Sequence, residues 1–125
     1  MSDDEIEGTV RFSSSLYTLH TVERRDVLMQ IQGPGAPKKI GIIKAKTIIG
    51  RSTDADIQIP SSLVSRQHLS LEREEIDLIC RDLDSHNGLL LNGIRVHSVA
   101  LREGDTLQIG DVVFIYHQGV QWASS

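Results

Sequence analysis

Three short polar segments carry the side chains of this sequence that are best suited to binding chemistry. Gly50-Arg51 follows an apolar run, Ser65-Arg66-Gln67-His68 precedes another, and Asp84-Ser85-His86-Asn87-Gly88 separates two more. Polar segments that alternate with apolar runs in this way indicate loops between short secondary-structure elements. If the fold brings the three loops to one end, they would form a single small polar patch.

The side chains of this patch suit an anion beside a peptide. A guanidinium such as that of Arg51 presents a fixed fork of donors that matches a tetrahedral oxyanion. Ser65 adds a short O–H donor, and Asn87 both donates and accepts, as contact with a peptide backbone requires. Each residue alone is ordinary for a surface loop, and it is their combination that carries information.

Catalytic chemistry is a weaker interpretation of the same segments. Ser65 and His68, with Asp82 or Asp84, supply the residue types of a hydrolytic triad. A serine and a histidine that are close in sequence are not thereby paired in space, and no Gly-x-Ser-x-Gly turn exposes a nucleophile. We therefore expect no enzyme activity and no catalytic residue.

Metal and nucleotide sites are also not expected. The histidines lack the spacing of metal ligands, so we predict no metal and no cofactor. The segment 33–39 has the glycines and lysines of a phosphate loop, but two prolines remove N–H donors and a β pattern follows. We predict a hairpin loop there. The five histidines are His20, His68, His86, His97 and His117.

Short β-strands must position these loops. From Asp26 onward, β signals recur about every 8–12 residues, and no window of ten residues or more has a capped helical stripe. Asn-Gly at 87–88 and 92–93 favours tight reversals. The pattern predicts an all-β sandwich or barrel of about ten strands, with function on the loops because the strands are committed to the core. Strands are predicted at 27–32, 40–44, 47–49, 56–59, 68–72, 76–81, 89–91, 94–96, 105–109 and 112–116.

The single cysteine points to a reducing compartment. Cys80 alternates with Ile76 and Leu78, which predicts a small buried hydrophobic side chain rather than a reactive thiol. The acidic start of the chain is unlike a signal peptide, and no apolar run is long enough to cross a membrane. We expect an intracellular location, in the cytoplasm or the nucleus.

The charge balance limits the range of partners. With 13 basic and 17 acidic residues the net charge is −4, which argues against binding to extended polyanions such as nucleic acids or anionic membranes. A local positive site is still available from Arg51 and Arg66, together with a lysine at 44 or 46. The lysines near one predicted edge support the alternative of a nucleic-acid-binding β domain, although a solvated edge explains them more simply. They are Lys38, Lys39, Lys44 and Lys46.

Five ordered motifs resemble those of the forkhead-associated (FHA) domain. They are Ile-Ile-Gly-Arg (48–51), Ser-Arg-Gln-His (65–68), Asp-Leu-Asp-Ser-His-Asn-Gly (82–88), Leu-Asn-Gly (91–93) and Leu-Arg-Glu-Gly-Asp (101–105). The resemblance covers about residues 27–118. It implies a β-sandwich of about eleven mostly antiparallel strands, with loops at one end that bind phosphothreonine peptides and with no catalysis.

The resemblance also implies a role for each matching position. Arg51 is expected to contact the phosphate and the peptide backbone, and Ser65 to hydrogen-bond a phosphate oxygen. Arg66 is expected to add phosphate contacts. Asn87 would hold the peptide main chain, and His86 would lie beside the bound threonine. Positions expected to support the site are Gly50, His68, Gly88, Asn92 and Gly93.

We interpret residues 1–25 as an acidic, Ser/Thr-bearing tail, with one extra strand as the alternative. Residues 26–118 are the predicted FHA domain and residues 119–125 a C-terminal tail. The predicted function is an interaction module that recruits a protein phosphorylated on threonine by an upstream Ser/Thr kinase.

Two alternative functions stay open. One is an FHA fold that binds its partner independently of phosphate, through a face of the sandwich. The other is regulation by the N-terminal tail itself, in which Thr9, Thr18 or Thr21 is phosphorylated and binds the domain in the same chain or in a second copy.

Overall fold

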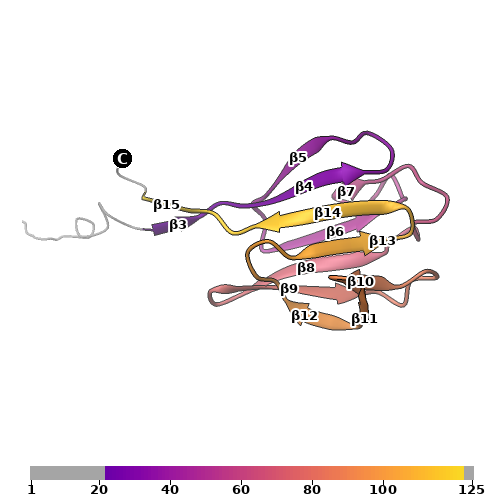
Figure 1. Ribbon diagram of the computed structural model, residues 1–125. Coiled ribbons are helices and arrows are strands. Elements are labelled where there is room, and N and C mark those ends of the chain that lie inside the picture. The colour runs from indigo at the N-terminus through magenta and orange to yellow at the C-terminus, as the bar shows by residue number, and fades with distance from the viewer. Residues whose placement is uncertain (1–21, 123–125) are drawn as a thin grey trace, which may run out of the picture. The chain divides into compact units, whose positions relative to one another are not determined.

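The computed structural model describes residues 22–122, which form β-strands and loops. The tail threonines Thr9, Thr18 and Thr21 lie outside the described residues. Within residues 26–118, two sheets contain eleven strands, one sheet in the order β11-β10-β13-β14-β4-β5 and the other in the order β12-β9-β8-β6-β7 (Figure 1). Every pair is antiparallel except β6 with β7. The predicted all-β sandwich is confirmed.

The strands of the six-stranded sheet are β4 (Asp26–Gln32), β5 (Lys38–Ile42), β10 (Leu89–Leu91), β11 (Ile94–Val96), β13 (Thr106–Ile109) and β14 (Val112–His117). Those of the five-stranded sheet are β6 (Lys46–Gly50), β7 (Ile57–Gln58), β8 (Leu69–Glu74), β9 (Asp77–Asp82) and β12 (Ser98–Ala100). The segment 33–37 joins the antiparallel pair β4 and β5, so the predicted hairpin loop is also confirmed.

Alternating side chains of both sheets meet between them and form the core. On β14, Val112, Phe114 and Tyr116 are buried, whereas the residues between them are partly exposed. This period of two is the signature of a strand with one face in the core. The same core holds Leu28, Ile49, Leu69, Leu71, Leu78, Cys80, Leu89, Leu107 and Ile109, each fully buried.

The hairpin between β8 and β9 differs from the prediction. Strand β8 continues to Glu74, and Glu75 turns the chain with a φ of 57°. Ile76 therefore lies in the turn and is 74% exposed, whereas Leu78 and Cys80 are buried as expected. The prediction for Ile76 was wrong because the turn lies at residues 75–76, whereas the predicted strands 68–72 and 76–81 left it at 73–75. Strand β12 was not predicted, because Ser98–Ala100 carries little alternation of its own and pairs along β9.

A separate unit contains the first and last described strands. β3 (Val22–Arg24) and β15 (Val120–Trp122) form an antiparallel two-stranded sheet, and the N–H of Arg25 donates to the carbonyl of Gly119 at 2.8 Å. Residues 1–25 were interpreted as a tail, with one extra strand as the alternative, and residues 119–125 as a C-terminal tail. The strands Val22–Arg24 and Val120–Trp122 are defined by their pairing with each other.

Residues 22–122 contain no helix that is long and apolar enough to cross a membrane.

Candidate functional site

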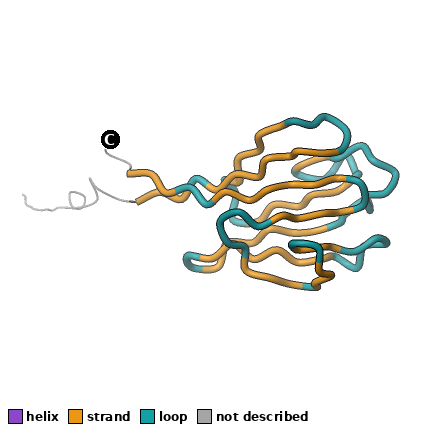
Figure 2. The backbone as a smooth tube through the Cα atoms, in the orientation of Figure 1, coloured by secondary structure: helices purple, strands orange, loops and turns teal. Residues whose placement is uncertain are grey.

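Three loops meet at one end of the sandwich, as the sequence predicted. The first loop follows β6, the second precedes β8 and the third connects β9 to β10. Figure 2 shows them among the loops at one end of the strands. Backbone hydrogen bonds join the first two loops, from the Arg51 N–H to the Ser65 carbonyl at 2.9 Å and from the Ser52 N–H to the Arg66 carbonyl at 3.1 Å. The polar segments are therefore held together by the fold.

Gly50 allows the first two loops to approach. A Cβ atom at this position would lie 2.1 Å from the Arg66 carbonyl oxygen and 2.9 Å from the Gln67 Cα atom. Those atoms belong to the backbone and cannot move aside as a flexible side chain would. Glycine is required because of the close approach.

His68 connects the second and third loops from inside the protein. Its side chain is fully buried, its Nδ1 accepts from the Ser65 N–H at 3.0 Å, and its Nε2 lies 2.7 Å from the Gly88 carbonyl. Because Nδ1 accepts, the ring proton of the neutral imidazole is on Nε2 and is donated to Gly88. The imidazole thus sets the spacing between the loop of Ser65 and the loop of Asn87.

Ser85 and Asp82 shape the third loop, and the sequence analysis did not single them out for this. The Ser85 hydroxyl donates to Asp82 Oδ1 at 2.5 Å and accepts from the Gly88 N–H at 2.9 Å. Gly88 has a φ of +80°, and a Cβ there would lie 2.7 Å from the Arg95 guanidinium carbon. The Asp-x-x-Ser spacing at 82–85 could have indicated this role, because Asp and Ser side chains often form hydrogen bonds with nearby backbone groups.

Four of the five predicted binding residues line one cavity of about 250 Å³. Arg51 Nε donates to the Val64 carbonyl at 3.0 Å, which leaves the two Nη groups with no partner among the described residues. The Ser65 hydroxyl oxygen accepts from the His86 N–H at 2.9 Å, and its own proton is available to donate. The lining residues are Arg51, Ser62, Leu63, Val64, Ser65, His86 and Asn87.

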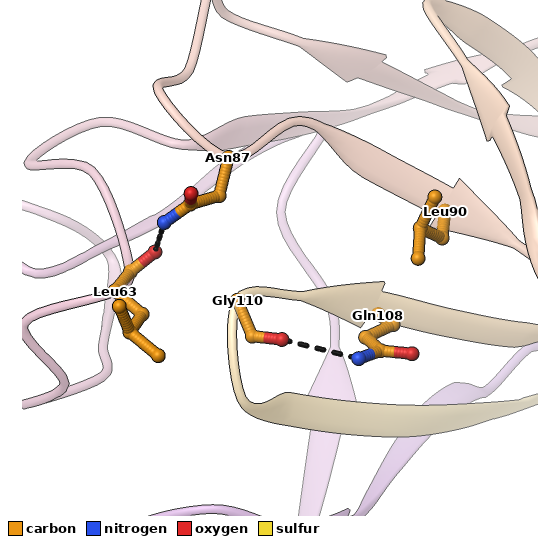
Figure 3. A pocket seen from close by; sticks show the side chains of 5 residues that line it. All are labelled: Leu63, Asn87, Leu90, Gln108 and Gly110. Atoms are coloured by element: carbon orange, nitrogen blue, oxygen red, sulfur yellow. Dashed lines mark hydrogen bonds between the residues drawn. The ribbon is translucent and has the colours of Figure 1, made fainter.

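Asn87 lies at the edge of the cavity with half of its amide already used. Its Nδ2 donates to the Leu63 carbonyl at 2.7 Å, and its Oδ1 has no partner within the described part of the chain. The free acceptor suits a peptide N–H. The geometry makes the expected main-chain contact more specific. The donor half of the amide orients the side chain, and the acceptor half is left for a peptide N–H (Figure 3).

Two predicted contributors to the positive charge lie elsewhere. Lys44 forms an ion pair with Asp56, and Lys46 lies 3.9 Å from Glu72 at the far end of β6 from Arg51. The prediction that either lysine adds to the site was wrong, because Lys46 lies at the start of β6 and Arg51 just after its end, and Lys44 is paired with Asp56. The side chain of Arg66 is exposed and does not line the cavity, although its carbonyl holds Ser52.

The remaining support residues form a neighbouring turn. Asn92 and Gly93, with φ of 50° and 86°, connect β10 to β11. The Asn92 Oδ1 accepts from the Thr106 N–H at 2.9 Å, and its Nδ2 donates to Asp105 at 3.1 Å. These bonds fix the turn against β13, and neither residue lines the cavity.

The geometry does not form a hydrolytic pair. His68 Nδ1 accepts from the backbone of Ser65, and the Ser65 hydroxyl contacts the His86 N–H instead. The described residues contain no group of three or more His, Cys, Asp and Glu side chains that could hold a metal ion. What the cavity offers is a guanidinium, a hydroxyl and an amide, with no acidic side chain in its lining.

A β-sandwich that gathers donors from three loops at one end is the architecture of a small module that binds an anionic ligand. The family model of the FHA domain matches residues 47–110, and the chain belongs to this family.

The chain is also similar to curated proteins and to solved structures. An ABC transporter ATP-binding/permease protein of Mycobacterium tuberculosis is 39% identical over 57% of this chain, and the glycogen accumulation regulator GarA of the same species is 32% identical over 74%. The match spans 8% of the transporter protein and 57% of GarA. A solved structure from a structural and functional analysis of phosphothreonine-dependent FHA domain interactions aligns over 74% of this chain and 95% of its own. Its TM-score is 0.68 at 28% identity.

Proposed function

We propose that the chain is a non-enzymatic module that binds a threonine-phosphorylated protein through the cavity of Arg51, Ser65, His86 and Asn87. The observation that carries the proposal is that free polar groups from three separate loops, the two Nη groups of Arg51, the Ser65 hydroxyl proton and the Asn87 Oδ1, converge on a cavity with no acidic lining. Family membership and the likeness to an FHA domain with phosphothreonine-dependent interactions support the choice of ligand.

A phosphothreonine matches the functional groups that are free. Its phosphate brings a charge of about −2 and three acceptor oxygens. The two Nη groups of Arg51 can bind two of these oxygens, and the Ser65 hydroxyl can donate to a phosphate oxygen. Such charge-assisted bonds contribute about 1.5–3 kcal/mol each before ordering costs, so two or three of them correspond to micromolar affinity.

The local charge explains how an acidic protein accepts an anion. The net charge of −4 acts on ligands that cover a large surface, whereas a single phosphate feels the few groups within a Debye length of about 8 Å. Within that distance, the positive charge of Arg51 dominates the electrostatic potential at the cavity. A Ser/Thr kinase acting upstream would create the ligand, and binding would then recruit the modified protein. Arg66 follows Ser65 in sequence, and its exposed side chain does not line the cavity, so its predicted phosphate contact remains a prediction.

The decisive experiment compares Arg51→Ala with the wild-type protein in a titration with a phosphothreonine peptide. We expect a loss of affinity of at least a hundredfold, because the variant lacks the only cation in the cavity lining. The unfolding midpoint should stay close to that of wild type, since the side chain is exposed. Arg102→Ala removes another exposed arginine outside the cavity and is the matched control.

Two results would overturn the proposal. Unchanged affinity of Arg51→Ala would remove the assignment of the phosphate site. Equal binding of phosphorylated and phosphatase-treated ligand would favour the alternative of phosphate-independent interaction.

A further inference from the structure

The outward-facing side chains in the middle of the six-stranded sheet are aliphatic. On β4, Val27, Met29 and Ile31 alternate with buried residues, and on β14 Val113 and Ile115 do the same. The two strands are neighbours and Ile115 is paired with Met29, so the five side chains adjoin one another (Figure 1). Ile31 is 49% exposed and the other four are partly exposed. These five residues are called the apolar sheet face below.

The outer face of the five-stranded sheet has the opposite character. Glu72 and Arg81 form an ion pair there at 3.2 Å, and Lys46 and Glu74 extend it with contacts at 3.9 Å and 3.0 Å. An antiparallel sheet with one face in water normally carries polar residues on that face, as this sheet does. The apolar sheet face departs from the rule, and contiguous apolar side chains with a polar rim are typical of an interaction site.

The β5 margin of the apolar sheet face is positively charged and open. Lys39 is paired with Met29 in the ladder and so lies on the same face, and Lys38 precedes it at the edge strand. Both lysines are exposed and have no partner among the described residues. Gly41 is paired with Val27, and a Cβ atom at this glycine would meet nothing within 4 Å. This margin can therefore accept an acidic group.

The other margins offer no acid to these lysines. Thr106 and Gln108 of β13, which pair with β14, are uncharged. At the end of β14, His117 already engages Glu103 at 2.8 Å. A second copy of the chain packed through the same face would thus leave Lys38 and Lys39 without opposite charges. The charge pattern favours a different protein that carries its own acids.

The backbone beneath the apolar sheet face is already fully committed to the sheet. Strand β14 pairs with β13 and β4, and β4 pairs with β14 and β5. A segment that lies over these strands must satisfy its own N–H and C=O groups, which an α-helix does along its length. A helix on a sheet is also a stable layer arrangement. From Val27 to Ile31 the face extends about 14 Å, which roughly three helical turns would cover.

We propose that the apolar sheet face binds an amphipathic helix of a partner protein, with an aliphatic stripe and with acidic residues along one flank. The stripe packs on Met29 and Ile115, and the acidic flank lies over β5 beside Lys39. No residue of the face lines the cavity of Arg51 and Asn87. The contact is therefore independent of phosphate and can form whether or not that cavity is occupied. It goes beyond the proposed function and does not rest on it.

The test titrates synthetic helical peptides of about fourteen residues into the isotope-labelled full chain and follows its amide resonances. The peptides share one leucine stripe and differ in having only Glu, only Gln or only Lys on the flank. We expect the Glu peptide to shift resonances of β4, β5 and β14 and to bind about fivefold more tightly than the Lys peptide. A Glu peptide with serine in place of the leucines should not bind.

Three variants assign the binding to this face. The double change Met29→Thr and Ile31→Thr keeps β-branched strand formers but removes aliphatic contacts, so it should weaken the Glu peptide at least tenfold. Lys39→Glu should reverse the order of the Glu and Lys peptides. Ile76→Thr changes a side chain that is 74% exposed in the β8–β9 turn of the other sheet, and as the matched control it should leave binding unchanged.

The same variants separate this proposal from the proposed function. Arg51→Ala should bind the Glu peptide like wild type, and the double threonine variant should bind a phosphothreonine peptide like wild type and keep a similar unfolding midpoint. Loss of phosphothreonine binding alone would therefore leave the apolar sheet face standing.

Four results would overturn the proposal. The first is no binding of the Glu peptide, and the second is binding that the double threonine variant retains. The third is a wild-type chain that sediments as a dimer while the double variant is a monomer, which would make a second copy the occupant. The fourth is binding to phosphatidylserine vesicles that only the double variant loses, which would make a lipid surface the occupant.

Discussion

Asn87 shows how one side chain can serve the fold while it keeps a polar group for the proposed ligand. Its Nδ2 is committed to the Leu63 carbonyl and its Oδ1 is free. Arg51 is divided in the same way, with Nε on the Val64 carbonyl and both Nη groups available. At the residue scale, the side chains of Arg51 and Asn87 are each oriented by one internal hydrogen bond, which leaves their other polar groups available to the proposed ligand.

We predict that Asn87→Ala weakens all phosphothreonine peptides by a similar factor, about tenfold, because it removes an acceptor for the peptide main chain and frees the Leu63 carbonyl. Isothermal titration with several peptides that differ around the phosphothreonine measures this. A loss confined to one peptide would contradict a main-chain contact. Asn92→Ala, in a turn outside the cavity, is the control for loss of an asparagine.

At the element scale, the loop before β8 organises the site through its backbone. Three consecutive carbonyls, those of Leu63, Val64 and Ser65, accept from Asn87, from the Arg51 side chain and from the Arg51 N–H. The loop is in turn anchored by the Ser61 hydroxyl on Asp111. A residue of the β13–β14 turn thereby sets the geometry of a site that it does not line.

We predict that Asp111→Ala lowers the affinity for a phosphothreonine peptide about fivefold, because the loss of a hydrogen bond to a charged acceptor loosens the loop. Asp111→Asn should retain most of the affinity, since its amide oxygen still accepts from Ser61. Peptide titrations and thermal unfolding measure both variants. Equal affinities for Asp111→Ala and wild type, with a lowered unfolding midpoint in Asp111→Ala, would show that the bond is merely structural.

The strands themselves were predictable where alternation was strong. The 112–116 prediction corresponds to β14 and the 27–32 prediction to β4, because both have one buried face. Prediction failed for Ile76 and for β12, where a turn position or a neighbouring strand decides the conformation. Alternation is a local property, whereas the start of a turn depends on which residues the partner strand still pairs.

At the scale of the whole molecule, the two sheets enclose a core that also isolates the only cysteine. Cys80 is fully buried, and burial, followed by the charge of Asp82, raises the pKa of its thiol to about 12. An ion pair at 2.9 Å between the partly exposed Arg73 and the buried Asp26 connects the two sheets, from β8 to β4. Access to the thiol therefore requires opening of the sandwich.

We predict that a thiol-specific disulfide reagent does not label Cys80 in the folded protein at pH 8, because a raised pKa keeps the thiol protonated there and the core excludes the reagent. The same reagent should label one thiol per chain in denaturant. Absorbance of the released thiolate follows the reaction. Rapid labelling without denaturant would contradict the described burial.

The sequence by itself determined the fold class and four of the side chains that line the cavity at the loop end, those of Arg51, Ser65, His86 and Asn87. Period-two alternation specifies strands, and the motifs around Arg51, Ser65 and Asn87 specify which loops carry donors. These are properties of residue type and spacing, which can be read locally along the chain.

Only the tertiary structure decided how those side chains are shared between fold and ligand. It placed Lys44 and Lys46 in ion pairs away from the site, it used one half of Asn87 internally, and it brought Leu63 and Asn87 from two different loops into one cavity lining. The reason is physical: hydrogen-bond partners and pocket walls come from residues far apart in sequence. Their distances are set by the packing of two sheets and by the buried imidazole of His68 between the loops.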